Sequence, residues 1–340
     1  MNRKKTEEKL FFSKTLDFLE HYLPHQAGKS RNTVETYRDA LTVFRRYILE
    51  IQHLSIRSFS FADCTHDLLL SYMQYLRESG NAAATCNNRL AAIRAYLWYV
   101  ADGDISIQSA ALTASHVPFL KEPKLTRETI SEAGLLALLS APPNTRVGKR
   151  DRMILILLYD SAIRVSELLS LDVRSINLDV PIPYIRIYGK GDKERIVAIT
   201  DATATHIRNY LKLYHPEMLT DTPFIYTVIK KHKGRMSIGN VERIIKKYAE
   251  QIRPEHPDLP KSCYPHMVRR TRATNLYQDG TELELISRIL GHSSTETTRI
   301  YATPSVEMMR KAMESGNLAT NEQPEWPDDE AEMARLCGLR

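Results

Sequence analysis

The sequence contains little cysteine and no Cys-x-x-Cys pair. Its four cysteines lie far apart in the chain, at Cys64, Cys86, Cys263 and Cys337. This spacing excludes a disulfide framework and is typical of a reducing compartment. Cys263 and His266 form a Cys-x-x-His pair, but no second pair with metal-ligand spacing follows. A small buried thiol is therefore expected there, and no metal site.

Long apolar runs are also missing. The longest, Met153–Tyr159, is much shorter than the roughly 20 residues that a membrane-spanning helix requires. Near the N-terminus, acidic residues such as Glu7, Glu8 and Asp17 interrupt what would be the apolar part of a signal peptide. We therefore expect a soluble, cytoplasmic protein with no membrane partner.

The overall composition is that of a folded protein with a small basic excess. Hydrophobic residues make up 43% of the 340 residues and charged residues 26%, which excludes a disordered chain and a collagen-like fibre. This length suggests two domains, each large enough to bury a core. The 47 Lys and Arg against 41 Asp and Glu give a net charge of +6. That balance favours a polyanionic partner but does not by itself identify a nucleic acid.

The first third of the chain has helical periodicity. Apolar residues recur at three- and four-residue steps over Val34–Ile48, and Asn32 with Glu35 has the spacing of a capping pair at the start of that helix. A shorter helix is expected before it, ending at Pro24, and two more are expected after it. Four helices with short connections predict an all-α bundle over residues 1–108.

The remaining chain divides into a linker, a second domain and a tail. Residues 109–124 lose the helical periodicity and contain Pro118 and Pro123, so they are interpreted as a linker. The second domain is expected over residues 125–315. The tail, residues 316–340, ends in a short helical pattern that needs a surface to lie on, either its own domain or another copy of the protein.

The second domain combines helices with one small sheet. The apolar segment Met153–Leu158 is expected at the centre of its core, and the alternation over Tyr184–Ile199, with a glycine-rich charged turn, predicts a β-hairpin. Helical patterning then returns around 241–248, at 266–278, at 282–290 and just after Ser294. The predicted fold class is mainly α with a small antiparallel β-sheet in the second domain.

Four segments of this domain hold side chains that are difficult to explain by core formation. They supply two arginines, a lysine, two histidines and a tyrosine, namely Arg164, Lys190, His266, Arg269, His292 and Tyr301. Each has an ordinary explanation when taken alone. Arg164 could form a surface ion pair with Glu167, a basic hairpin turn is commonly just solvated, and Tyr301 could be an exposed tyrosine without a role.

Taken together, these side chains suit the chemistry of a phosphate. The planar guanidinium of arginine grips two phosphate oxygens at once. The set contains no carboxylate pair for Mg²⁺, so no metal or other cofactor is expected. A site that holds phosphate through cations alone uses either a protein nucleophile or an external one, and Tyr301 is the candidate for the first.

The order Arg, Lys, His-x-x-Arg, His, Tyr resembles the tyrosine recombinase (phage integrase) family, which includes integrases and Xer-type recombinases. The local sequences that match are Ala162-Ile163-Arg164-Val165-Ser166-Glu167-Leu168, Gly189-Lys190-Gly191 with Lys193 and Arg195, His266-x-x-Arg269, and Leu290-Gly291-His292 with Tyr301. The intervals of 26 between the two histidines and of nine between His292 and Tyr301 also match. Two positions depart from the pattern: Ala162 stands where the family usually has glycine, and Arg270 where it often has histidine.

The resemblance implies a fold and a reaction. The fold is an N-terminal four-helix core-binding (SAM-like) domain followed by a C-terminal catalytic domain, which together clamp DNA. Attack by the Tyr301 hydroxyl would form a 3′-phosphotyrosyl link and free a 5′-hydroxyl, and a second strand's 5′-hydroxyl would then reseal the backbone. Arg164 and Arg269 would hold the non-bridging oxygens, and Lys190 would protonate the leaving oxygen. His266 would act on the tyrosine proton, and His292 would be a further phosphate donor.

The resemblance also implies partners. They are double-stranded recombination sites, bound by a homo-tetramer on two duplexes that is a monomer or dimer when free; accessory DNA-binding proteins are compatible with this scheme. DNA contacts are expected from Arg89 and Arg94 in the first domain, although a solvated helix face is an equal alternative. Lys193 and Arg195, beside the hairpin turn, are expected to contact DNA as well.

The biological role stays open. Integration, excision or transposition of a mobile element is favoured because nothing identifies a housekeeping role, and Xer-type dimer resolution is the alternative. A DNA-binding protein of this fold without cleavage would lack an arginine or the tyrosine, and none is missing. A type IB topoisomerase would act as a monomer, and a phosphatase or nuclease with a tyrosine intermediate would hydrolyse without rejoining.

Overall fold

A computed structural model of the chain describes residues 9–122, 128–188, 194–229, 232–292, 294–299, 301–302, 304, 306–315 and 329–339. The chain forms two compact units, Met1–Thr126 and Arg127–Arg340, which we describe separately. Among the helices in the described ranges, none is long and apolar enough to cross a membrane.

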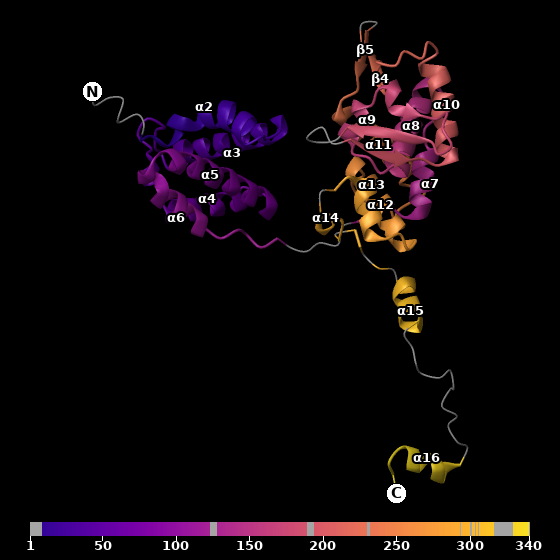
Figure 1. The fold of residues 1–340 in the computed structure, drawn as a ribbon. Coiled ribbons are helices and arrows are strands. Elements are labelled where there is room, and N and C mark those ends of the chain that lie inside the picture. The colour runs from indigo at the N-terminus through magenta and orange to yellow at the C-terminus, as the bar shows by residue number, and fades with distance from the viewer. Residues whose placement is uncertain are drawn as a thin grey trace. The chain divides into compact units, whose positions relative to one another are not determined.

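In its described part, the N-terminal unit is built from helices (Figure 1). They are η1 (Phe11–Lys14), α2 (Thr15–Asp17), η2 (Phe18–Gln26), α3 (Arg31–Glu50), η3 (Phe61–Asp63), α4 (His66–Glu78), α5 (Ala83–Gly103), η4 (Ile105–Ile107) and α6 (Gln108–His116).

Two predicted helix ends in this unit are wrong. Helix α3 begins after Ser30, whose side chain accepts the Thr33 N–H, so the cap lies two residues before the predicted Asn32. The helix expected to end at Pro24 continues to Gln26 as the π-helix η2. The wider turn lets the Ala27 N–H bond the Tyr22 carbonyl at 2.8 Å, so the helix passes the proline that would stop an ordinary α-helix.

Aromatic rings fill the core of the N-terminal unit. The ring of Phe11 lies at its centre, with centroids 5.3 Å from those of Phe44, Phe59 and Tyr96. These rings meet at inclined angles, which is the arrangement that aromatic quadrupoles favour. Because the contacts join η1, α3 and α5, they bind segments that are far apart in the sequence.

The start of the predicted linker is wrong, because residues 108–117 belong to this core. Helix α6 packs on α5 through Ala111 and Ala114, which are fully buried together with Val117. Alanine side chains let two helices approach closely but produce little hydrophobic periodicity, so the sequence pattern did not predict this helix.

The C-terminal unit combines helices with two small sheets. Its helices are α7 (Glu132–Ser140), α8 (Arg146–Asp160), α9 (Val165–Ser170), η5 (Val173–Ser175), α10 (Asp201–Tyr214), α11 (Ile238–Ile252), α12 (Pro265–Gln278), α13 (Leu283–Leu290), α14 (Glu296–Arg299), α15 (Val306–Ser315) and α16 (Glu330–Leu336). Its strands are β1 (Ile176–Asn177), β2 (Tyr184–Tyr188), β3 (Glu194–Ala198), β4 (Tyr226–Ile229) and β5 (His232–Arg235).

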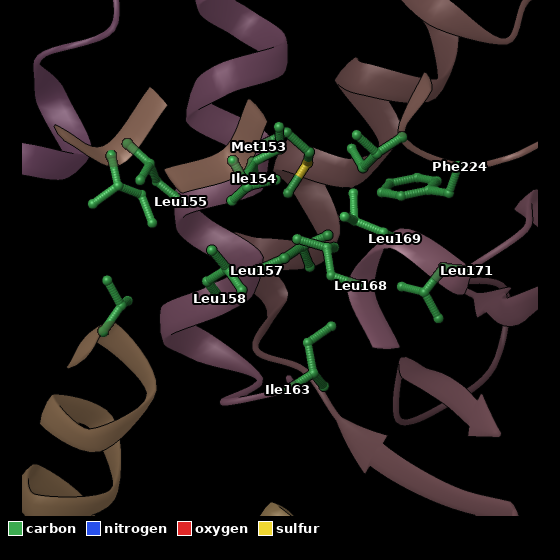
Figure 2. Close-up of a cluster of buried hydrophobic side chains, with 14 of the residues drawn as sticks. Met153, Ile154, Leu155, Leu157, Leu158, Ile163, Leu168, Leu169, Leu171 and Phe224 are labelled. Atoms are coloured by element: carbon green, nitrogen blue, oxygen red, sulfur yellow. The ribbon is translucent and has the colours of Figure 1, made fainter. Parts of the chain in front are cut away.

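Helix α8 lies at the centre of this unit, as predicted. Figure 2 shows apolar residues of this helix, among them Met153 and Leu158, in one cluster with Leu168 of α9 and with Phe224, which lies just before β4. The segment Met153–Leu158 of this helix is entirely apolar and therefore has to be covered by other elements, and α7, α9, α10 and α12 all contact α8.

The predicted hairpin is confirmed as part of a three-stranded antiparallel sheet in the order β1-β2-β3. Ile185 and Ile187 of β2 and Val197 of β3 point into the core, as the alternation requires. The mainly α fold class with a small antiparallel sheet is thereby confirmed. Helix α10 and the second hairpin, β4–β5, were not predicted.

The chain entering the C-terminal unit is attached to the middle of α12. The Ile130 N–H donates to Thr271 Oγ1 at 3.0 Å, and the buried Arg270 donates to the carbonyl of Glu128. Arg270, one of the two departures from the family pattern, is therefore committed to this attachment.

Candidate active site

Five of the six predicted catalytic residues are described, and each lies at the start or end of a helix or in α12. Arg164 precedes α9, His266 and Arg269 lie in the first two turns of α12, His292 follows α13, and Tyr301 follows α14. The sixth, Lys190, lies outside the described residues, as does Lys193.

Arg269 is the buried cation of the site. Its residue is 1% exposed, and it donates to the carbonyls of Ala162 (2.7 Å) and Leu290 (2.6 Å). Its Nη2 also lies 3.2 Å from His292 Nε2. Burial, and then the neighbouring charge of Arg164, lowers the pKa of Arg269 to about 10, so it stays charged at neutral pH. A desolvated charge of this kind interacts strongly with any anion that approaches it.

Glu167 connects the arginines. Its carboxylate accepts the Arg164 N–H (2.7 Å) and Nη1 (2.9 Å) and both terminal nitrogens of Arg195 (2.8 Å each), and Arg269 Nη1 lies 3.9 Å away. Burial opposes its ionisation, but these hydrogen bonds and charges prevail and lower the pKa of Glu167 to about 2. Because Glu167 is only 6% exposed, its contact with Arg164 is not the surface ion pair that the sequence left open.

Arg164 is the most exposed of the three arginines around Glu167. Its side chain is 41% exposed, against 15% for Arg195 and 2% for Arg269. Its Nη2 donates to the Gly291 carbonyl at 3.2 Å, which fixes the guanidinium between α9 and the end of α13. Arg164 is therefore the arginine of this cluster that a phosphate from solvent can reach most directly.

His292 is held as a neutral imidazole. Burial, together with the charges of Arg269 and Arg164, lowers its pKa to about 4. Its Nδ1 lies 2.9 Å from the hydroxyl oxygen of the buried Thr298. Since Arg269 can only donate, Nε2 accepts from it, and the ring proton is on Nδ1, where it can bond Thr298.

Tyr301 is buried against the same cluster, so the exposed tyrosine that the sequence left open is wrong. Its residue is 2% exposed and packs with Ala162, Ile286 and Leu290. The hydroxyl lies 3.4 Å from His266 Nε2, and the ring lies 6.0 Å, centroid to centroid, from that of His292. A histidine at this distance can take the hydroxyl proton once the contact shortens.

Ala162 shows why the family pattern usually has glycine here. Its φ is +48°, in the left-handed region that costs a non-glycine residue about 1–2 kcal/mol. This backbone turn directs the Ala162 carbonyl to Arg269 and places Arg164 at the start of α9. The geometry of the site thus survives the departure from glycine.

The residues predicted to bind DNA all have intramolecular partners where they are described. Arg195 binds Glu167 inside the cluster. Arg89 donates to Asn81 Oδ1 at 3.0 Å. Arg94 donates to the carbonyls of Ala114 (2.8 Å) and Val117, and its guanidinium lies 4.3 Å from the centroid of the Phe119 ring. Arg94 therefore stabilises the attachment of α6 to α5 in the free protein.

Sequence reasoning named Glu167 and Arg195 but missed that both organise the site. The role of Glu167 could have been found from its position three residues after Arg164, where a carboxylate caps the first turn of α9. Arg195 could have been placed from strand alternation, since it shares a face of β3 with the buried Val197.

The described groups form one continuous set of contacts that runs from Arg164 through Glu167, Arg269 and His292 to Tyr301 and His266. It can hold a phosphate beside a hydroxyl nucleophile and a base. In the described part of the chain, no group of three or more His, Cys, Asp or Glu side chains is arranged to hold a metal ion.

Comparison with known proteins shows the family of the chain. Residues 128–308 match the model of the phage integrase family, and residues 16–102 match that of the phage integrase N-terminal SAM-like domain. The chain is 29% identical over 294 residues to tyrosine recombinase XerD of Staphylococcus aureus, covering 85% of this chain and 94% of the relative. XerD of Staphylococcus epidermidis is 26% identical over 295 residues, which cover 86% of this chain and 94% of the relative.

Two solved structures have a similar fold. The Tn1549 transposon integrase, in complex with a circular intermediate DNA, has a TM-score of 0.66 at 17% identity, over 88% of this chain and 99% of that one. The XerH site-specific recombinase, bound to its difH substrate before cleavage, has a TM-score of 0.60 at 23% identity, over 82% of this chain and 78% of that one.

Proposed function

We propose that Tyr301 is the nucleophile of this protein. The premise is that the chain belongs to the phage integrase family and is a tyrosine site-specific recombinase that breaks and rejoins DNA. The observation that carries this proposal is the position of the Tyr301 hydroxyl, 3.4 Å from His266 Nε2 and in the same contact network as the arginines Arg164 and Arg269.

The reaction is a transfer of one phosphodiester bond. The Tyr301 oxygen bonds to phosphorus, the bond to the 5′-oxygen breaks, and the hydroxyl proton passes to His266. Lys190 supplies a proton to the leaving 5′-oxygen. The reverse step, with a 5′-hydroxyl of another strand as nucleophile, reseals the backbone, so the bond energy is kept and no cofactor is consumed.

The two catalytic arginines have different tasks in this scheme. Arg164, half-exposed, meets the incoming phosphate, while the buried Arg269 supplies a fixed positive charge behind it. His292 orients Arg269 through its Nε2 and donates to phosphate only after it changes tautomer. Since Tyr301 is 2% exposed in the free protein, DNA binding has to open a path to its hydroxyl.

The substrate is a double-stranded recombination site, and the reaction unit is a homo-tetramer on two duplexes. We propose that the task is integration, excision or transposition of a mobile element. The 29% identity to XerD over nearly its whole length supports a second candidate, resolution of chromosome or plasmid dimers. The similar proteins include both a transposon integrase and Xer recombinases, so the DNA that the protein cleaves has to distinguish the two roles.

Covalent capture tests the nucleophile and the role in one experiment. The wild type and Tyr301→Phe are expressed in cells that carry the native flanking DNA, and DNA linked to the protein is recovered and sequenced. We expect adducts from the wild type alone. Adducts at the ends of a mobile segment support the first role, and adducts at one chromosomal or plasmid site support the second. Adducts from Tyr301→Phe would refute the assignment of the nucleophile.

DNA contact by the N-terminal unit is tested by salt dependence. If Arg89 and Arg94 leave their partners to bind phosphates, Arg89→Gln reduces the slope of log K against log salt by about one. An unchanged slope would mean that this residue only stabilises the helix pair. Arg94→Gln is expected to lower the stability of the unit as well, because the carbonyls of Ala114 and Val117 each lose a hydrogen bond.

A further inference from the structure

Arg195 contacts the groups that hold the catalytic arginines but lies away from the surface. It follows the hairpin turn on strand β3, and its side chain is 15% exposed. Both terminal nitrogens donate to the two oxygens of Glu167 at 2.8 Å, which is the parallel, bidentate geometry of a strong charge-assisted pair. A guanidinium used in this way has little left to offer a DNA backbone.

We propose that Arg195 is a positioning residue of the recombination reaction, which occupies Glu167 so that the guanidinium of Arg164 stays available to the scissile phosphate. This proposal rests on the proposed function. It replaces the direct DNA contact that the sequence predicted for Arg195.

The first observation behind this proposal is that Arg164 and Arg195 share the carboxylate of Glu167. Arg164 takes one oxygen through Nη1 and the other through its backbone N–H, and its Nη2 is directed to the Gly291 carbonyl. If Arg195 were absent, Glu167 could accept both terminal nitrogens of Arg164. The guanidinium would then turn toward the carboxylate and away from solvent, where the phosphate arrives.

The second observation is that the end of α13 leaves room for the Arg195 side chain. Gly291 ends the helix with φ +61°, and a Cβ built there would lie 2.7–2.8 Å from the Arg195 guanidinium. The same glycine holds Arg164 through its carbonyl and leads directly into His292. Arg195 therefore packs on the backbone that fixes both Arg164 and His292.

The third observation is the balance of charges around Glu167. Arg164, Arg195 and Arg269 converge on one carboxylate whose pKa is far below its usual range. A lysine at position 195 would keep the charge but could not grip both oxygens in the fork geometry. Arg195→Lys thus removes the geometry and leaves the charge, which makes it the informative substitution.

The test compares cleavage of two substrates by three proteins. The substrates carry the cleavage site captured from the wild type, with either an ordinary scissile phosphate or a methylphosphonate, in which a methyl group replaces one non-bridging oxygen and its negative charge. The proteins are the wild type, Arg195→Lys, and the control Arg186→Lys, which alters an exposed ion pair with Glu194 (3.3 Å) on the same sheet.

We expect Arg195→Lys to bind the site as the wild type does and to cleave the phosphate about 10²-fold more slowly. On the methylphosphonate the cleavage rate of Arg195→Lys should be only a few-fold below that of the wild type. The reason is that this substrate lacks one charged non-bridging oxygen, so Arg164 has less negative charge to neutralise. Arg164→Lys, measured as a fourth protein, should give the same signature, and Arg186→Lys should match the wild type on both substrates.

Two results would overturn the proposal. An equal deficit on both substrates would mean that Arg195 only supports the fold, and weaker binding with a smaller salt slope would mean that it contacts DNA directly. If Arg195→Lys does not fold, Arg195→Gln, which can still donate one hydrogen bond to Glu167, is measured with the same criteria. Absence of cleavage by the wild type would instead refute the proposed function, whatever the variants do.

Discussion

The two units of this chain bury different kinds of side chain. The N-terminal core is made of apolar and aromatic residues such as Phe11, Phe44 and Tyr96. Tyrosine and cysteine apart, every buried polar or charged side chain in the described ranges belongs to the C-terminal unit, where Glu167 and Arg269 lie. Buried charges cost stability unless they have partners. Glu167 and Arg269 find theirs within the candidate active site, whereas the buried Asp151 and Arg270 are bonded elsewhere in the unit.

From this difference we expect substitutions in the two units to affect the cleavage step differently. In the N-terminal unit, stability depends on apolar burial and can fall without any change in the cleavage step. In the candidate active site of the C-terminal unit, the groups that offset each other's burial cost are the same groups that would hold the phosphate. There, stability and chemistry should fall together.

The largest expected effect comes from a pair of substitutions of similar cost to folding. Glu167→Gln leaves three arginines around a neutral side chain and should cost about 3–5 kcal/mol of stability, as when a buried pair is broken. Leu69→Ala in the N-terminal core should cost about 2–5 kcal/mol. Single-turnover cleavage at saturating protein should fall by about 10³-fold in the first and stay unchanged in the second.

Denaturant unfolding and rapid-quench cleavage check these values, and Leu69→Ala is measured under conditions in which it is fully folded. An equal loss of cleavage in both variants would remove the distinction between the units.

The next effect is expected at Gly291, where the conformation and the space both exclude a side chain. Gly291→Ala places a Cβ against the Arg195 guanidinium in a left-handed residue, which should cost about 1–2 kcal/mol. Displacement of Arg164 and His292 should slow cleavage by about 10²-fold. The matched control is Gly280→Ala, which also has a positive φ (+88°) but no atom near the added Cβ. It should cost similar stability and leave cleavage unchanged; slower cleavage by that control would assign the effect to backbone strain alone.

The smallest effect is a dependence of stability on pH. The pKa of His292 is about 4 in the folded protein, against about 6.5 in an unfolded chain. As pH falls below 6.5, the unfolded chain binds a proton that the folded chain does not, so the C-terminal unit loses stability down to about pH 4. Burial lowers the pKa of His215 in the same unit and adds to this loss.

Urea unfolding at pH 7 and pH 5 measures this effect. His292→Gln should lose less stability than the wild type over this interval, while Leu69→Ala should lose as much as the wild type. Identical pH dependence in wild type and His292→Gln would show that this histidine is not held neutral.

Much of the site could be predicted from the sequence, because its residues lie in short motifs with fixed spacing. The helix that precedes His292 has clear apolar periodicity, and the hairpin that carries Arg195 has clear alternation. What the motifs could not reveal is which partner a charged side chain binds. Alternation along β3 puts Arg195 on the same face as Val197, but only the structure shows that Arg195 binds Glu167.

The two misplaced elements break the same rule for different physical reasons. Helix α6 packs through alanines, and η2 continues past Pro24 by widening its turn, so neither follows the rule that large apolar side chains mark helices and proline ends them. Ala162 departs from a different rule, the preference of non-glycine residues for negative φ, and its carbonyl accepts from Arg269 in this left-handed conformation.

The attachment of residues 128–130 to α12 has a consequence for exchanging domains between related proteins. Arg270 and Thr271, which hold Glu128 and Ile130, directly follow Arg269 in the helix. A hybrid protein joined after Ile130 would carry foreign backbone at these contacts and disturb the helix next to its buried arginine. A hybrid joined before Glu128 keeps them, so that point is where the N-terminal unit can be exchanged without loss of the contacts beside Arg269.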